Sequence, residues 1–368
     1  MGYYFYFGDK CTKFQLNYQI NKRKNSLVPF FFFIFAINME QDKAITISLI
    51  IPVYNVSAYI ERCLKSVIKQ TYNHFECILV DDSSPDDSIA KCEQMIADYD
   101  GPIQFRIFHH EHNRGLSAAR NTGTDAATGD YVLYIDSDDI ISNDCVEKLM
   151  APILKDDSIE MVLGENLRFS DEGLFNHQKY FLMHKEELTS NEAIRGYYFD
   201  INRRFPSVAW NKLISKKFIN EHHIRFKEGQ IWEDALWHFF MVKYLNHIFV
   251  IPDVTYFYYY RPDSISSYMH RKELRRHWCL VQVDISANLT LGDESREAAK
   301  HSIVFNDNYI YQPKTPEFRA TAQRFSKALP FRKYPKEKML LWAAMLLPHN
   351  HTGKEIFKWI QKQLFPYK

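Results

Sequence analysis

The sequence predicts an α/β fold with a mostly parallel central sheet and helices on both faces. Apolar runs rich in β-branched and aromatic residues recur at 45–51, 75–80, 103–108 and 131–135. Stretches with apolar residues at helical spacing lie between these runs, which is the pattern of βαβ units. Polar clusters follow three of the runs. Because ligands bind at the carboxyl ends of parallel strands, these clusters are expected to share one edge of the sheet.

The first predicted strand and the helix after it set the pattern for the others. The run over 45–51 is almost uninterrupted, as in a strand buried on both faces of a parallel sheet. Ser57 is expected to cap the next helix, whose apolar positions are Ile60, Leu64, Val67 and Ile68. Later helices are expected over 88–99 with Asp87 as the cap, over 115–127, where Arg120 stands among small residues, and over 143–154.

Two predicted strands end in carboxylates. The run over 131–135 leads into Asp136, Asp138 and Asp139. Carboxylates this close repel one another unless a cation or hydrogen-bond donors lie among them, and oxygen ligands suit Mg²⁺ or Mn²⁺. A divalent cation is therefore the expected cofactor, although Asp139 could simply brace Asp138. The run over 75–80 leads into Asp81 and Asp82; Asp81, like the later Asp86, could only cap or solvate the turn.

The second half of the chain is less regular after Gly164. An aromatic, strand-like run covers 248–260. Before this run, Glu233 and Asp234 fall in the first turn of a predicted helix, where the positive end of the helix dipole favours an ionised carboxylate. The alternative is a helix-end charge pair with no catalytic duty.

Composition limits the class of protein. The chain has 368 residues, enough for one large domain with an appendage, and a formal net charge of +1. It lacks the overall positive charge that would point to nucleic acid, and no nucleic-acid partner is expected. Its six cysteines are scattered without a CxxC pair, which predicts reduced thiols and a cytoplasmic location.

Both ends of the chain raise the question of a membrane. The apolar run over 27–37 follows basic residues but is too short to span a bilayer. Residues 1–43 are therefore expected to be a disordered or untranslated extension, with Met39 as the alternative start, or a weak surface anchor. From Lys314 onward basic residues outnumber the acids, and short amphipathic helices are expected. These helices either pack on the rest of the protein or lie on the inner face of the cell membrane.

Several segments together resemble the bacterial family 2 glycosyltransferases of capsule and lipopolysaccharide synthesis. In the first half they are Ile50–Asn55, Gln70–Tyr72, Ile78–Ser84, Asn113–Gly123, Gly129–Tyr131 and Asp136–Asp139. Trp210–Leu213 and Trp232–Leu236 are similar, more loosely, to acceptor-side segments of that family. The resemblance implies the GT-A fold, a Rossmann-like domain, over 44–267, with a nucleotide-binding half at 44–164 and an acceptor half at 165–267. The remaining 268–368 would be a helical appendage.

The resemblance also implies an activity. This is the metal-dependent, inverting transfer of a hexosyl or N-acetylhexosaminyl group from a nucleotide-diphosphate sugar, with a UDP-sugar as the expected donor. The acceptor would be a hydroxyl of a glycan or a lipid-linked molecule in surface polysaccharide synthesis.

Carried over by position, the family's site residues fall on matching residues of this sequence. The implied nucleotide-sugar site contains Pro52, Tyr54, Asn55, Asp82, Arg120, Asp136 and Ser137. Within it Asp82 would read the base, Tyr54 would pack on it, and Arg120 would lie beside the diphosphate or the base-binding carboxylate. Asp138 would be the direct metal ligand. Asp234 would be the general base that takes the acceptor proton, with Glu233 as its substitute.

Simpler interpretations and rival functions stay open beside this one. Tyr54 could be a core residue, and His109, His110 and His112 are expected to be exposed rather than to form a metal site. A receiver domain is disfavoured because a complete strand and helix precede Asp82. A sugar nucleotidyltransferase would need a Gly-rich basic loop after the first strand, which 53–57 lacks. The third alternative is a non-catalytic protein that binds sugar nucleotides or glycans.

Overall fold

The structure is a computed structural model of the chain, and it describes residues 6–7, 10–11, 45–171, 173–179, 184–199, 206–261, 272–289, 294–307 and 315–365. It divides into two compact units, Met1–Ala44 and Ile45–Lys368. In the first unit, β1 (Tyr6–Phe7) and β2 (Lys10–Cys11) form an antiparallel pair. The alternative start at Met39, the apolar run over 27–37 and the expected boundary at 267/268 lie outside the described residues, so the expected domain limits stay predictions.

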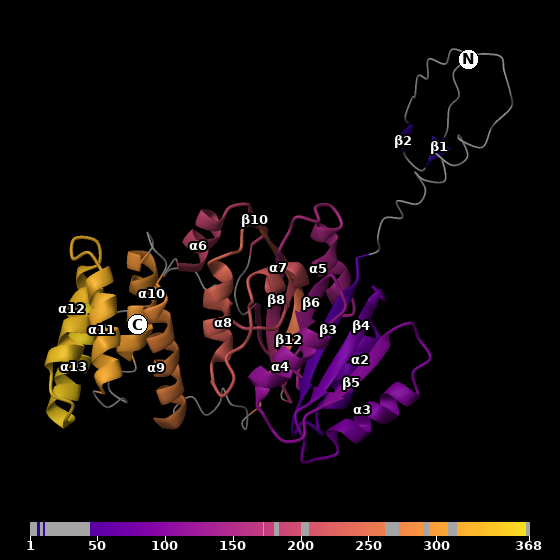
Figure 1. The fold of residues 1–368 in the computed structure, drawn as a ribbon, viewed down its shortest axis with the longest axis horizontal. Coiled ribbons are helices and arrows are strands. Elements are labelled where there is room, and N and C mark those ends of the chain that lie inside the picture. The colour runs from indigo at the N-terminus through magenta and orange to yellow at the C-terminus, as the bar shows by residue number, and fades with distance from the viewer. Residues whose placement is uncertain are drawn as a thin grey trace, which may run out of the picture. The chain divides into compact units, whose positions relative to one another are not determined.

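A ten-stranded sheet forms the centre of the second unit (Figure 1). Its strands are β3 (Ile47–Val53), β4 (Phe75–Asp81), β5 (Gln104–His109), β6 (Tyr131–Tyr134), β7 (Ile140–Ile141), β8 (Met161–Ser170), β9 (Gly173–Lys179), β10 (Glu186–Leu188), β11 (Lys212–Ser215) and β12 (Ile248–Tyr259). The main path runs β10-β12-β8-β11-β6-β3-β4-β5, with β7 paired to β12 and β9 to β8. Strands β3 to β6 are mutually parallel, as predicted, whereas β11 runs antiparallel to both of its neighbours and makes the other half mixed.

Helices cover both faces of this sheet. They are α2 (Ile60–Ile68), α3 (Ser88–Ala97), α4 (Leu116–Ala126), α5 (Cys145–Ile153), α6 (Asn191–Phe199), α7 (Lys216–Glu221) and α8 (Glu233–Val242). Strand β3 contributes to two cores, because Leu49 packs with α2 and α5 whereas Ile50 packs with α4 and α8. Helix α4 lies so close to the sheet that a Cβ on Gly123 would come within 2.3 Å of the Ile50 side chain. This close approach explains why α4 is rich in small residues.

Among the described residues, five helices follow the sheet, and a helical region here is what the sequence predicts. They are α9 (Lys272–Ala287), α10 (Glu294–Asp307), α11 (Pro316–Ala328), α12 (Pro335–Leu346) and α13 (His351–Leu364). They have an apolar core of their own, which includes the buried Phe305, Phe325, Leu340 and Phe357. Helices α9 and α10 also contact α8 and α6 of the sheet domain.

Two further findings concern membranes and thiols. Among the described residues, no helix combines the length and the apolar character that crossing a bilayer requires. Cys63, Cys77, Cys92, Cys145 and Cys279 are buried free thiols, as their scattered positions predict.

Of the two predicted helix caps, Ser57 is wrong, and Asp87 has the predicted position but makes no side-chain cap hydrogen bond. Helix α2 starts without a side-chain cap, and the Ser57 hydroxyl instead contacts Asp87. Asp87 stands at the cap position of α3, but Asp86 accepts the hydrogen bond from Ser88 N (3.1 Å) as well as one from Ser57 N (2.9 Å). Burial alone would raise the pKa of Asp86, yet hydrogen bonds from the Ser88 and Ser84 hydroxyls, together with those from Ser57 N and Ser88 N, lower it to about 2. Asp86 therefore fastens the turn after β3 to the start of α3, which no spacing rule indicates.

Candidate functional site

The predicted site residues follow neighbouring strands at one edge of the sheet. Tyr54 and Asn55 come directly after β3, Asp82 after β4 and Asp136 shortly after β6. Because β3 lies between β4 and β6 and all three are parallel, their carboxyl ends point the same way. Pro52 is paired within β3, and Tyr54 is 45% exposed, which rules out the core position considered for it.

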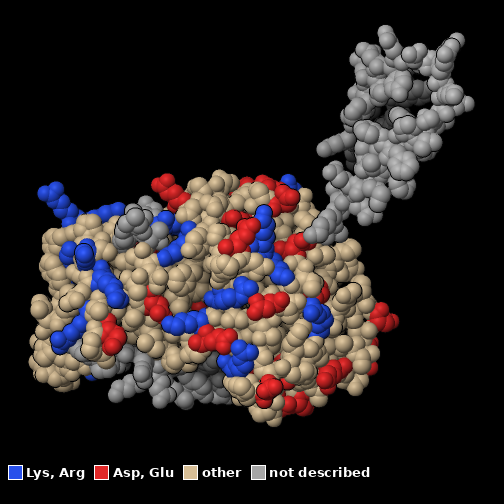
Figure 2. Space-filling model, in the orientation of Figure 1, with Lys and Arg blue, Asp and Glu red and all other residues tan. Residues whose placement is uncertain are grey.

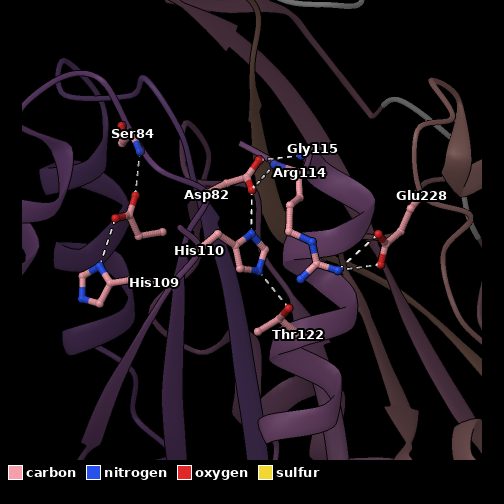
Figure 3. A network of polar contacts seen from close by, with 9 residues as sticks. Asp82, Ser84, His109, His110, Arg114, Gly115, Thr122 and Glu228 are labelled. Atoms are coloured by element: carbon pink, nitrogen blue, oxygen red, sulfur yellow. Dashed lines mark hydrogen bonds and ion pairs between the residues drawn. The ribbon is translucent and has the colours of Figure 1, made fainter. Parts of the chain in front are cut away.

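Backbone amides and a histidine hold the Asp82 carboxylate (Figure 3). Asp82 Oδ1 accepts hydrogen bonds from Arg114 N (2.8 Å) and His110 Nδ1 (2.7 Å), and Oδ2 accepts one from Gly115 N (2.7 Å). The far nitrogen of His110 lies 2.9 Å from the Thr122 hydroxyl. A carboxylate has about four acceptor positions, so these three bonds leave one on Oδ2. Asp82 is thus fixed in position and can still accept one hydrogen bond.

The expectation that His110 is exposed is wrong. Its side chain is only 5% exposed because the residue follows β5 beside the end of β4 and faces Asp82. The neighbouring His109 side chain is exposed and contacts Asp81 instead, at 3.0 Å. The two histidines therefore turn to different carboxylates. Asp81 also accepts a hydrogen bond from Ser84 N, in keeping with a role in the turn.

Arg120 joins three distant parts of the chain. From α4, it donates a hydrogen bond of 2.6 Å to Asp136 Oδ1 after β6 and another of 2.6 Å to Glu233 Oε1 at the start of α8. The guanidinium is buried, which alone would lower its pKa, but Asp136 and Glu233 raise the pKa above its ordinary value. Arg120 therefore stays charged and locks two acidic side chains at the same edge of the sheet.

The other two aspartates after β6 have different surroundings. Asp139 is fully buried and accepts hydrogen bonds from the Tyr256 hydroxyl (2.6 Å) and Tyr259 N (2.7 Å), so it braces this turn against β12. Burial raises its pKa well above the ordinary value. Asp138 Oδ2 lies 3.1 Å from Arg261 Nε, and burial together with the charge of Asp136 raises the pKa of Asp138 to about 6.

The two acids at the start of α8 also have different hydrogen-bond partners. Glu233 is tied to Arg120, whereas Asp234 accepts a short-range bond from Ala235 N at 2.8 Å. Burial and the neighbouring Glu233 raise the pKa of Asp234 to about 7, against the opposing effect of Arg120. Lys212 of β11 is buried as well, and burial lowers its pKa to about 7, although Asp234 acts to raise it. Asp234 is thus a carboxyl group that changes charge near neutral pH.

Comparison with known proteins decides the family. The sequence model described as "Glycosyl transferase family 2" matches residues 48–219. Glycosyltransferase GlyG of Streptococcus pneumoniae serotype 4 is 33% identical over 247 residues, which are 65% of this chain and 77% of GlyG. The chain belongs to glycosyltransferase family 2.

Two further comparisons bear on this family 2 chain. Glycosyltransferase GlyA of the same organism is 32% identical over 239 residues, which are 63% of this chain but only 32% of GlyA. The chain therefore spans about a third of the length of that relative. The crystal structure of S. aureus TarS 1-349 in complex with UDP-GlcNAc has a TM-score of 0.64 at 21% identity and covers 88% of this chain and 93% of TarS 1-349. This likeness confirms the expected GT-A fold.

Sequence reasoning missed several residues of the candidate site. Arg62 donates a hydrogen bond to the Asp138 carbonyl oxygen at 2.8 Å, and its guanidinium lies 3.7 Å from the centre of the Tyr259 ring. Tyr256 and Tyr259 hold Asp139. Nothing in the sequence separates Arg62 and Tyr256 from ordinary helix and strand residues, and the weak likeness of Tyr258–Arg261 to the family indicated no role for Tyr259. His110, by contrast, could have been found, because it follows a strand that neighbours the one ending in Asp82.

Proposed function

We propose that this chain transfers a sugar from a nucleoside-diphosphate sugar to an acceptor hydroxyl with inversion at the anomeric carbon. The observation that carries the proposal is the Arg120 bridge, which holds Asp136 of the nucleotide side and Glu233 of the acceptor side on one guanidinium. Membership of family 2 supports a glycosyl transfer. The structure of TarS with UDP-GlcNAc supports a UDP-sugar, of N-acetylhexosaminyl type, as the first donor to test. The proposed acceptor is a glycan or a lipid-linked molecule of surface polysaccharide synthesis.

The nucleoside half of the donor is assigned to the ends of β3 and β4. The remaining acceptor position on Asp82 is suited to an N–H group of a base, and the exposed ring of Tyr54 offers a face for that base to stack on. Asn55 adopts a left-handed backbone conformation, with φ of 52°, and its N–H donates to Ser84 Oγ at 2.8 Å. The turn that carries Tyr54 and Asn55 is thus fastened to the turn after Asp82.

The residues after β6 fit a hard divalent cation. Asp136 and Asp138 supply carboxylate oxygens, the donor type that Mg²⁺ and Mn²⁺ prefer. The raised pKa of Asp138 marks a carboxyl group whose charge is poorly compensated, even with Arg261 beside it. In this proposal Asp138 is the direct ligand, with Asp136 and Ser137 next to the donor. When bound, such an ion would offset negative charge on the departing diphosphate.

Asp234 is the proposed general base. As the acceptor oxygen attacks the anomeric carbon, its proton passes to the Asp234 carboxylate, and the carbon–oxygen bond to the diphosphate breaks with its electron pair on the nucleotide. Attack opposite the leaving group gives inversion. A pKa of about 7 suits this role because the carboxylate is partly ionised at neutral pH and can hold the proton it receives. Glu233 is less suited because Arg120 already holds it.

The test is a screen of sugar nucleotides for metal-dependent hydrolysis and transfer by the full chain. We expect Asp138→Ala to lose metal-dependent donor binding. Asp234→Asn should keep donor binding but lose turnover by about 10² to 10⁴-fold, the usual contribution of a general base. The exposed Asp98→Asn is the matched control. Donor binding without turnover in the wild type, across the screen, would instead favour a non-catalytic binding protein.

A further inference from the structure

Helix α12 is apolar on two opposite faces. Leu340, Leu341 and Ala344 are buried in the core of the helical region. Met339, Trp342 and Leu346 are 44%, 42% and 82% exposed. Their spacing of three and four residues places them on one stripe along the helix, opposite to the buried residues. The solvent-facing side of a helix is ordinarily polar, and an exposed apolar stripe marks a surface that binds another molecule or a membrane.

Basic residues border this stripe. Phe331, just before the helix, is 49% exposed and stacks on Trp342 with ring centres 5.8 Å apart. Arg332, Lys333 and Lys336 are exposed at the same end of the helix. The α12 surface is defined here by its apolar and basic members, which are Phe331, Arg332, Lys333, Lys336, Met339, Trp342 and Leu346.

Positive charge predominates in this part of the chain. Residues 315–365 contain ten Lys and Arg against three acids, although the whole chain is nearly neutral. Figure 2 shows blue side chains spread over the left of the molecule, where α11–α13 lie in Figure 1. Helix α13 adds Trp359, which is 64% exposed, and Lys362. An exposed apolar stripe beside basic side chains is the pattern of helices that lie in the interface of an anionic membrane.

We propose that the α12 surface docks on an anionic lipid bilayer. Phe331, Trp342 and Leu346 would enter the boundary between headgroups and acyl chains, where aromatic side chains are favoured. Arg332, Lys333 and Lys336 would meet lipid phosphates, each contributing through the negative surface potential. A second copy of the chain is the less suitable occupant, because a symmetric contact would bring these basic residues against their own copies.

The test measures co-sedimentation of the full chain with vesicles of phosphatidylcholine, with and without phosphatidylglycerol. One variant carries Trp342→Ser and Leu346→Ser, and a second carries Lys333→Glu and Lys336→Glu. A matched control carries Leu154→Ser and Lys155→Glu, which are exposed on the sheet domain. Because every changed side chain is exposed, all variants should fold, and circular dichroism checks this.

We expect the wild type and the control to bind the anionic vesicles equally. The apolar variant should bind about tenfold more weakly, and each lost basic charge should cost at least about fivefold, with high salt abolishing the difference between the charge variant and the wild type. Three outcomes overturn the proposal: no binding by the wild type, equal binding by all variants, or a change from oligomer to monomer in the apolar variant without a change in lipid binding. None of these readouts depends on glycosyl transfer.

Discussion

Two groups of carboxylates lie at the same edge of the sheet, and they are stabilised in opposite ways. Asp82 is met by two backbone N–H groups and one histidine, so that its charge is balanced by fixed donors. The acids around Arg120, by contrast, stand close to one another. Asp234, beside Glu233, has its pKa raised to about 7, and Asp138, whose pKa the neighbouring Asp136 helps to raise, reaches about 6. Asp82 is thus held in one position by its donors, whereas Asp138 and Asp234 are carboxyl groups whose raised pKa values bring them close to neutral pH.

This difference matches two tasks of the proposed reaction. Recognition of a base needs a hydrogen-bond acceptor that is held in one position. The donors that follow β5 and precede α4 hold the Asp82 carboxylate in this way. Proton transfer and cation binding need carboxyl groups whose ionised form is destabilised until a proton or a cation binds. Arg120 serves the second task, because it holds Asp136 and Glu233 and leaves Asp234 without such a bond. Three substitutions test this difference, and their expected effects fall from Arg120 through Asp234 to His110.

The largest effect is expected for Arg120→Ala. Removing one partner of a buried ion pair leaves uncompensated charge, here on Asp136 and Glu233, at a cost of about 3 to 5 kcal/mol in the free energy of unfolding. Urea titration at neutral pH measures this loss. Arg120→Lys keeps the charge but lacks the fork that reaches both acids, so it should recover only part of the loss.

Arg225→Ala is the control for that substitution. Arg225 pairs with the exposed Asp125 at 2.8 Å, and loss of such a surface pair should cost less than about 1 kcal/mol. Equal losses for the two arginines would contradict the central position given to Arg120.

The second substitution, Asp234→Asn, should stabilise the protein at high pH. The pKa of Asp234 is about 7 in the folded chain and ordinarily 3.8, so between these values the folded state holds a proton that the unfolded state releases. Its contribution to stability is therefore present at low pH and is lost as the pH rises toward and past 7. The groups that act on it are Glu233, Arg120, Asp136, Lys212 and Tyr198.

We expect Asp234→Asn to be more stable than the wild type by roughly 2 kcal/mol at pH 8, with no advantage near pH 3. Urea titrations across this pH range measure the difference. Asp98→Asn, on the exposed face of the sheet domain, should show no such trend. A constant difference at all pH values would show that Asp234 does not titrate near neutrality and would remove its claim as the base.

The parallel half of the fold could be predicted because its signals are local. Uninterrupted β-branched runs gave the positions of β3, β4 and β6 to within two residues, and small residues marked α4. The order of the strands placed Asp82 and Asp136 at one edge. The resemblance placed Arg120 beside the diphosphate or the base-binding carboxylate, whereas Arg120 contacts Asp136 and Glu233. No sequence rule says which acid a buried arginine meets.

The mixed half could not be predicted because its pairings join distant segments. Strand β11 has four residues and lies between β6 and β8, which precede it by dozens of positions. Asn211, at φ of 58°, holds the carbonyl oxygen of Gly164 and the hydroxyl of Thr255, which fixes β11 between its neighbours. The bracing of Asp139 by Tyr256 and Tyr259 likewise crosses more than a hundred residues. Such contacts leave no periodic pattern.

The smallest effect is expected where Asp82 loses one donor of three. His110→Ala removes the bond to Asp82 Oδ1 but leaves the Arg114 and Gly115 N–H groups in place. We expect a loss of about 1 kcal/mol in stability and a rise of a fewfold in the KM for the donor. The value of kcat should not change, because His110 lies outside the Arg120 group of acids.

His109→Ala separates this effect from a general disturbance of the loop. His109 is exposed and contacts Asp81, so its loss should leave both KM and stability within error of the wild type. Steady-state kinetics with a donor found in the screen gives the two constants. A fall in kcat for His110→Ala at unchanged KM would mean that the Asp82 group takes part in the chemical step, and the two carboxylate groups would then have to be treated as one.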